Sequence, residues 1–113
     1  MAPLVSHVKQ QGLIEARAYH QLQCFEAGVL FARQEGIVPA PEANHAVKGA
    51  IDEALQCREE GVSRAILFNL CGHGHFDMQA YTDYFAGKLT DQVYEESELA
   101  MALSGLPSVP EPT

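Results

Sequence analysis

Residues 43–61 read ANHAVKGAIDEALQCREEG and carry the clearest structural signal in the chain. Small and apolar residues recur in this stretch at the i, i+3, i+4 and i+7 spacing of one helical face. They are Ala43, Ala46, Val47, Ala50, Ile51, Ala54 and Leu55. Charged residues between Asp52 and Glu60 fall on the other face, and Gly61 is a typical residue to end a helix. We therefore predict a long amphipathic helix here.

A second helix is predicted immediately before this one, over Gln21–Glu35 (QLQCFEAGVLFARQE). Its apolar residues lie almost all round the helix, so it needs burial on more than one side. Gly36 is expected to end it. Pro39 and Pro41 then stiffen the loop that joins the two helices.

Two stretches carry strand signals. Arg64–Leu70 (RAILFNL) is a short apolar run bounded by turn residues, as in a strand that is buried on both faces of a parallel sheet. Ala16–His20 is the second candidate strand. With helices between and beside them, the pattern predicts an α/β fold: part of a three-layer α/β/α arrangement with a mainly parallel sheet. Because a sheet normally has more than two strands, the chain is expected to belong to a larger body.

The two ends of the chain complete the expected organisation. Leu4, Val5 and Val8 predict a short first helix, which Gly12 ends. We expect residues 1–89 to form the α/β portion, residues 90–104 an acidic helical extension, and the proline-rich residues 105–113 a disordered tail.

Composition excludes several classes of protein. The 113 residues include fifteen Asp and Glu against seven Lys and Arg, so a basic surface for nucleic acid or an anionic membrane is not expected. No apolar run approaches the roughly 20 residues that span a bilayer. Three widely spaced cysteines, Cys24, Cys57 and Cys71, indicate free thiols in a reducing, cytoplasmic setting.

The candidate binding loop is Cys71–Phe76, which follows the second predicted strand and precedes a helix expected to start near Asp77. Ligands of open α/β folds bind beyond the carboxyl ends of strands, and Gly72 and Gly74 allow a close backbone approach. A metal site is a weaker alternative. Its ligands would be His73, His75 and Asp77, with His45 or Cys71 as a fourth. We expect no metal, and expect these histidines to shape the loop instead.

Two motifs resemble a known family. Residues 32–46 (ARQEGIVPAPEANHA) are similar to the AR-x-EGI-x-PA-x-E-x-x-HA stretch of tryptophan synthase β chains. Residues 70–77 (LCGHGHFD) resemble the LSGRG loop of the same family. The details CFEAGVLFAR and GHGHFD look closer to its second, tryptophan-synthase-like branch. The resemblance covers roughly residues 1–89 and corresponds to the C-terminal portion of that enzyme.

The resemblance implies a fragment of a fold-type-II enzyme that uses pyridoxal phosphate (PLP) for β-replacement, converting L-serine and indole to L-tryptophan. Cys71 matches the position that faces the pyridine nitrogen, usually serine in the family, and a neutral group there moderates the electron sink. Gly72, His73 and Gly74 match the rest of the cofactor-binding loop, where His73 replaces an arginine. Glu42 matches a glutamate that assists catalysis. From the residues alone, Glu42 can equally be a first-turn carboxylate that the helix dipole favours.

Two parts of such a site are absent from the sequence. None of the three lysines (Lys9, Lys48, Lys88) stands in the His-Lys-x-Asn setting of the family's Schiff-base lysine, and its glycine-rich phosphate loop is missing. We therefore expect this chain to be inactive and free of PLP by itself. Its partner would be the N-terminal portion of the same enzyme or a complementing chain. The alternative is a standalone binding or scaffold domain that forms a homo-oligomer.

Overall fold

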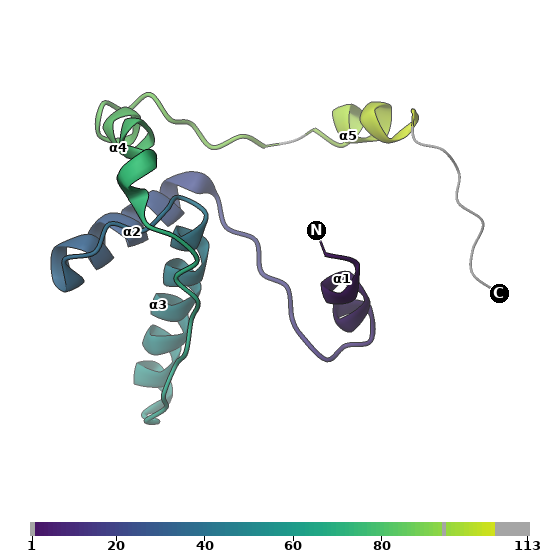
Figure 1. Ribbon diagram of the computed structural model, residues 1–113. Coiled ribbons are helices and arrows are strands. Elements are labelled where there is room, and N and C mark those ends of the chain that lie inside the picture. The colour runs from purple at the N-terminus through teal and green to yellow at the C-terminus, as the bar shows by residue number, and fades with distance from the viewer. Residues whose placement is uncertain (1, 94, 106–113) are drawn as a thin grey trace.

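The computed structural model describes residues 2–93 and 95–105, and its regular structure consists of helices (Figure 1). The elements are α1 (Pro3–Gln10), α2 (Gln21–Glu35), α3 (Ala43–Glu60), the short 3-10 helix η1 (Gly74–Phe76), α4 (Met78–Phe85) and α5 (Glu96–Leu103). Helices α2, α3 and α4 pack together, whereas α1 and α5 stand apart from them.

The core lies where α2 crosses α3 and α4 covers the crossing. Phe25 of α2 contacts two tyrosines of α4, edge-on with Tyr81 at 5.2 Å and stacked with Tyr84 at 5.4 Å between ring centroids. Val47 of α3 is 2% exposed. The remaining buried members are small: Cys24, Ala27, Ala40, Ala43 and Cys57. Small side chains permit the two long helices to approach closely at this crossing.

Both long helices confirm the sequence predictions. Helix α2 runs from Gln21 to Glu35 as expected, and Gly36 ends it in the left-handed conformation at φ 72°. Helix α3 ends in the same way at Gly61, with φ 68°. The buried part of α3 is mainly its first half. Leu55, near its C-terminal end, is 42% exposed although it belongs to the predicted apolar face.

The predicted α/β fold with a mainly parallel sheet is wrong for the described residues. They contain one isolated bridge, between Pro39 and His73, and no sheet. Arg64–Leu70 is irregular, and its Leu67 side chain is 96% exposed. Ala16–His20 is also irregular, and an ion pair between Arg17 and Glu53 holds it on α3. A strand requires a neighbouring strand for its backbone hydrogen bonds, and the described chain provides none.

The helix in the acidic segment is shorter than predicted. Helix α5 begins at Glu96. Asp91 lies outside it, and its carboxylate accepts a hydrogen bond from Leu22 N at 3.1 Å, in the first turn of α2. Asp91 thus satisfies one of the free N–H groups at that helix end. Of the predicted tail, residues 106–113 lie outside the described residues.

Within the described residues, none of the helices has the length and hydrophobicity needed to cross a membrane. Cys24, Cys57 and Cys71 are free thiols, as predicted.

The α2–α3 crossing gives a first prediction. A Cβ added at Gly28 would lie 2.2 Å from Asn44 Oδ1, inside the packed crossing. Gly28→Ala should therefore lower the free energy of unfolding by about 1–3 kcal/mol, measured by urea denaturation followed by circular dichroism. Gly49→Ala is the matched control, because its added Cβ would meet only the Tyr19 ring at 3.9 Å. It should raise stability by up to about 1 kcal/mol through helix propensity. Equal effects of both variants would contradict this packing.

Candidate functional site

The predicted binding loop is joined to the segment that precedes α3. Ala40 N donates to Gly72 O at 2.9 Å, and Gly74 N donates to Val38 O at 2.7 Å. These two hydrogen bonds form the antiparallel bridge between Pro39 and His73. The loop begins at Cys71, 28 residues after Ala43 at the start of α3, and the bridge brings the two into one corner of the fold.

The bridge leaves no room for a side chain at Gly74 and little room for one at Gly72. A Cβ at Gly74 would lie 2.7 Å from the carbonyl oxygen of Pro39 and 2.7 Å from Val38 Cγ1. A Cβ at Gly72 would lie 3.3 Å from Ala40 Cβ. In the structure the two glycines therefore serve close packing of the loop on residues 38–40.

Glu42 lies at the N-terminal boundary of α3, two residues beyond the bridge. Its side chain is exposed and makes no capping hydrogen bond. Together with Cys24, Phe25, His45 and two further residues, Glu42 lines a shallow pocket of about 190 Å³ between α2 and α3. A carboxylate beside the start of a helix is favoured by the helix dipole and stays available to a ligand.

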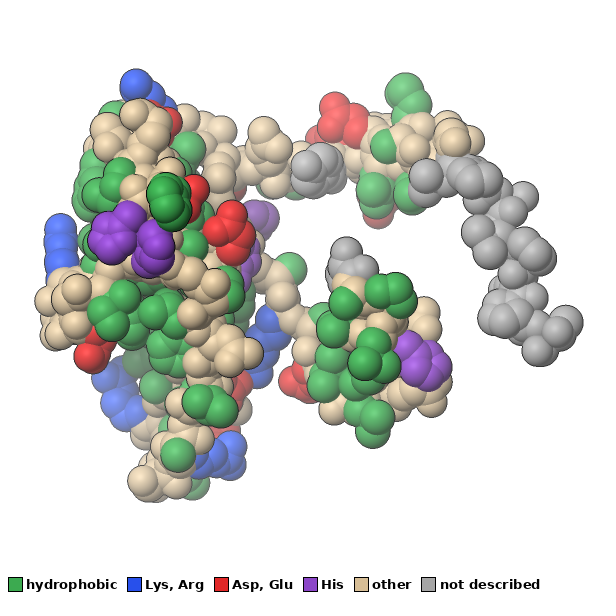
Figure 2. Space-filling view, viewed as in Figure 1, with side chains coloured by type: hydrophobic (Ala, Val, Ile, Leu, Met, Phe, Trp, Pro, Cys, Tyr) green, Lys and Arg blue, Asp and Glu red, His purple; other side chains and the backbone are tan. Residues whose placement is uncertain are grey.

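Cys71 is exposed at the start of the loop, and its sulfur has no hydrogen-bond partner among the described residues. The next side chains along the loop interact with one another. His73 Nδ1 lies 3.0 Å from His75 Nδ1 and also accepts a hydrogen bond from His75 N at 3.2 Å. Both histidines are exposed, and histidine side chains gather on the surface of the helical body next to hydrophobic ones (Figure 2).

The two histidine side chains interact with each other inside the loop. In the described part of the chain, no group of three or more His, Cys, Asp or Glu side chains is arranged to hold a metal ion. The alternative set of His73, His75 and Asp77 with His45 or Cys71 is therefore not assembled.

A buried series of hydrogen bonds links Asn44, Tyr81 and Pro39 of the bridge. Asn44, which is 0% exposed, donates from Nδ2 to the Tyr81 hydroxyl oxygen at 3.0 Å. That hydroxyl donates to the carbonyl oxygen of Pro39 at 2.6 Å. Burial raises the pKa of Tyr81, so the hydroxyl keeps the proton that it donates. Helices α3 and α4 are thereby tied to the middle residue of the bridge.

Sequence reasoning missed Asn44 and Tyr81. Two features of the sequence could have pointed to Asn44. It lies next to the apolar face of α3, and Gly28 lies in the interior of α2. A glycine inside a helix often marks the close approach of another chain segment, which here is the Asn44 side chain.

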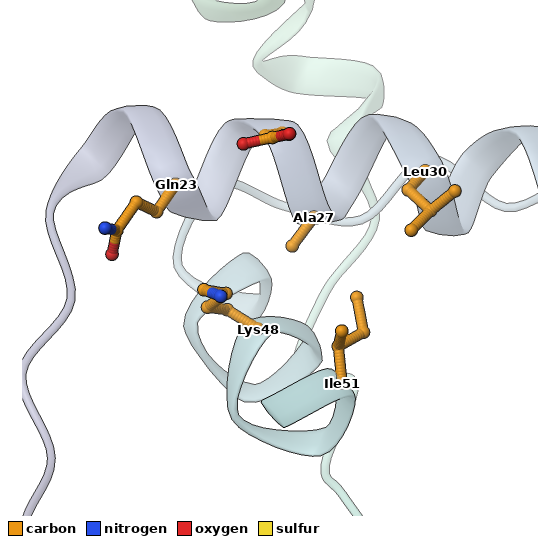
Figure 3. A pocket seen from close by; sticks show the side chains of 6 residues that line it. Gln23, Ala27, Leu30, Lys48 and Ile51 are labelled. Carbon is orange, nitrogen blue, oxygen red and sulfur yellow. The ribbon is translucent and has the colours of Figure 1, made fainter. Parts of the chain in front are cut away.

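Lys48 is the lysine nearest in sequence to these residues. It lines a second pocket of about 240 Å³ between α2 and α3, with Gln23, Ala27, Leu30 and Ile51 among its neighbours (Figure 3). Its ammonium group lies 2.7 Å from Asp52 Oδ1, and this hydrogen bond raises the pKa of Lys48. A lysine that attacks a carbonyl must lose its proton, so Lys48 is poorly suited to attach a cofactor.

Comparison with known proteins connects this corner to an enzyme family. The chain is 60% identical over 90 residues to tryptophan synthase beta chain 2 of Aquifex aeolicus. It is 54% identical over 88 residues to the protein of the same name from Methanosarcina mazei, and 54% over 99 residues to that of Pyrococcus abyssi. The chain is a homologue of tryptophan synthase beta chains. No protein-family model matches it.

The matches cover 80%, 78% and 88% of this chain but only 21%, 20% and 22% of these relatives. The chain thus spans about a fifth of the length of the tryptophan synthase beta chains that it matches. The resemblance to tryptophan synthase β chains inferred from the two motifs is confirmed, and these three relatives are named beta chain 2.

The bridge gives the second prediction. Gly74→Ala should lower the free energy of unfolding by about 1–3 kcal/mol, because its Cβ would meet backbone that cannot rotate away. Gly72→Ala is the matched control, and it should cost less than about 1 kcal/mol because its Cβ would meet only a methyl group at 3.3 Å. Urea denaturation measures both values, and a larger cost for Gly72→Ala would contradict the geometry.

Proposed function

We propose that this chain is the C-terminal portion of a PLP-dependent β-replacement lyase of the tryptophan synthase beta type, which makes L-tryptophan from L-serine and indole. The observation that carries the proposal is the identity of 60% over 90 residues to a tryptophan synthase beta chain. The bridge adds support, since it gathers Glu42 and the loop Cys71–Gly74 into one corner.

The residues present fit one side of the cofactor. The exposed Cys71 thiol offers a neutral hydrogen-bonding group for the pyridine nitrogen, and Gly72 and His73 present backbone next to it. When bound, PLP supplies an electron sink that labilises the bonds at the substrate's α-carbon. In this proposal Cys71 keeps the ring nitrogen unprotonated. Glu42 holds or moves a proton at its carboxylate.

The other side of the cofactor needs groups that this chain lacks. The phosphate-binding loop is missing from the sequence, and Lys48 is protonated and paired with Asp52. We therefore propose that the chain is inactive alone and that the N-terminal portion of the enzyme, or a complementing chain, completes the site.

An exposed apolar segment supports a partner of this kind. We call Arg64–Leu70 the open segment, since its backbone makes no hydrogen bond within the described residues. Leu67 is 96% exposed, and Ile66 and Leu70 are 38% and 37% exposed. Extended backbone with free N–H and C=O groups and apolar side chains is the surface to which another chain adds.

The same surface would also serve the second candidate, a standalone binding or scaffold domain that forms a homo-oligomer. The two proposals differ in what covers the open segment. Light scattering of the purified chain separates them. A monomer at micromolar concentration would contradict the homo-oligomeric scaffold.

A complementation experiment tests the proposed enzyme and gives the third prediction. The portion of the Aquifex aeolicus relative that this chain does not match is produced separately, and the two are mixed with PLP, L-serine and indole. We expect no tryptophan from either part alone and steady formation from the mixture. A mixture that forms a complex yet makes no tryptophan would overturn the proposal.

Glu42→Gln tests the role of that carboxylate in the same mixture. It should lower kcat by roughly 10²–10⁴-fold, the usual contribution of a general acid or base. Glu59→Gln, an exposed substitution on the same helix, is the matched control and should leave kcat unchanged. Full activity of Glu42→Gln would remove Glu42 from the site.

A further inference from the structure

The bridge that joins the two halves of the candidate site depends on a side-chain contact to its middle residue. Pro39 has no N–H, and its carbonyl oxygen accepts the Tyr81 hydroxyl proton at 2.6 Å. The flanking residues Val38 and Ala40 make the two backbone hydrogen bonds to Gly74 and Gly72. Tyr81 therefore fixes the bridge from the side of α4.

Asn44 holds the end of the bridge segment from the side of α3. Its backbone N–H lies 3.3 Å from the carbonyl oxygens of both Ala40 and Pro41, and its side chain donates to Tyr81. The amide group is fully buried, and it occupies the space beside Gly28 that a Cβ would fill. Asn44 is two residues beyond Glu42, so its placement also sets the position of Glu42.

The direction of these hydrogen bonds leaves one consistent arrangement. A carbonyl oxygen only accepts, so the single Tyr81 proton goes to Pro39 at 2.6 Å rather than to Asn44 Oδ1 at 3.3 Å. Asn44 must then present its NH₂ group to the tyrosine. The Tyr81 ring is itself held edge-on against Phe25, which fixes the hydroxyl in space.

We propose that Tyr81 and Asn44 are positioning residues, and that their hydrogen-bonded chain holds Glu42 and the loop Cys71–Gly74 in a fixed relative position. They do not touch the reacting atoms and act through Pro39. This inference rests on the proposed function, because it assigns Glu42 and the loop to one catalytic site.

The test combines two measurements on Tyr81→Phe, with Tyr84→Phe as the matched control. Tyr84 packs on the same Phe25 ring, and no hydrogen bond is made by its hydroxyl within the described residues. The first measurement is amide hydrogen exchange of the full chain by NMR. In Tyr81→Phe, exchange of the Ala40 and Gly74 amides should become about tenfold faster or more, while the Val47 amide in α3 keeps its protection.

The second measurement is steady-state kinetics of the complemented enzyme. Tyr81→Phe should lower kcat by roughly ten- to a hundredfold with little change in the KM for L-serine, since the residues that bind substrate remain but are misplaced. Tyr84→Phe should match the unchanged chain in both measurements.

The outcomes are distinguishable. Unchanged exchange at Ala40 and Gly74 overturns the positioning role whatever the kinetics show. Faster exchange with unchanged kcat also overturns it, because the contact is then structural only. A mixture of the unsubstituted parts that forms a complex yet stays inactive refutes the proposed function instead, and the positioning role, which rests on that function, is overturned with it.

Discussion

The fold is organised around one buried amide. Asn44 is fully enclosed where α2 and α3 cross, and a buried polar group of this kind is tolerated only when it is hydrogen-bonded. The Tyr81 hydroxyl oxygen accepts a hydrogen bond from the Asn44 amide, and the hydroxyl donates its own proton to the carbonyl oxygen of Pro39. These two hydrogen bonds connect three parts of the fold: the crossing of α2 and α3, the helix α4 packed on it, and the bridge to the binding loop. Gly28 permits this arrangement, because any larger residue would occupy the space of the amide.

The sequence predicted the helices well because helical signals are local. The residues that signal each helix lie within it or directly after it. In α3 they are the apolar residues of one face, and at the ends of α2 and α3 they are the capping glycines. Asn44 and Tyr81 are 37 residues apart in sequence, so no local sequence pattern predicts the hydrogen bond between them.

The strand prediction failed for a related reason. The apolar run Arg64–Leu70 indicates that these side chains need cover, and this remains true of the structure, where Leu67 is 96% exposed. The apolar run does not predict which segment buries these side chains. A strand exists only with its neighbour, and the described residues contain no segment that pairs with this run. The chain spans about a fifth of the length of its relatives, and our proposal is that the remaining portion of such a protein buries these exposed apolar side chains.

Association with that portion is the central claim, and calorimetric titration of this chain into it is the most direct test. The account predicts saturable binding at one chain per complementing portion. Leu67→Asp should weaken this binding by about tenfold or more, because a buried leucine contributes about 1.5–3 kcal/mol. Leu99→Asp, on the separate helix α5, should leave it unchanged. No binding by the unsubstituted chain, or equal binding by Leu67→Asp, would contradict the account.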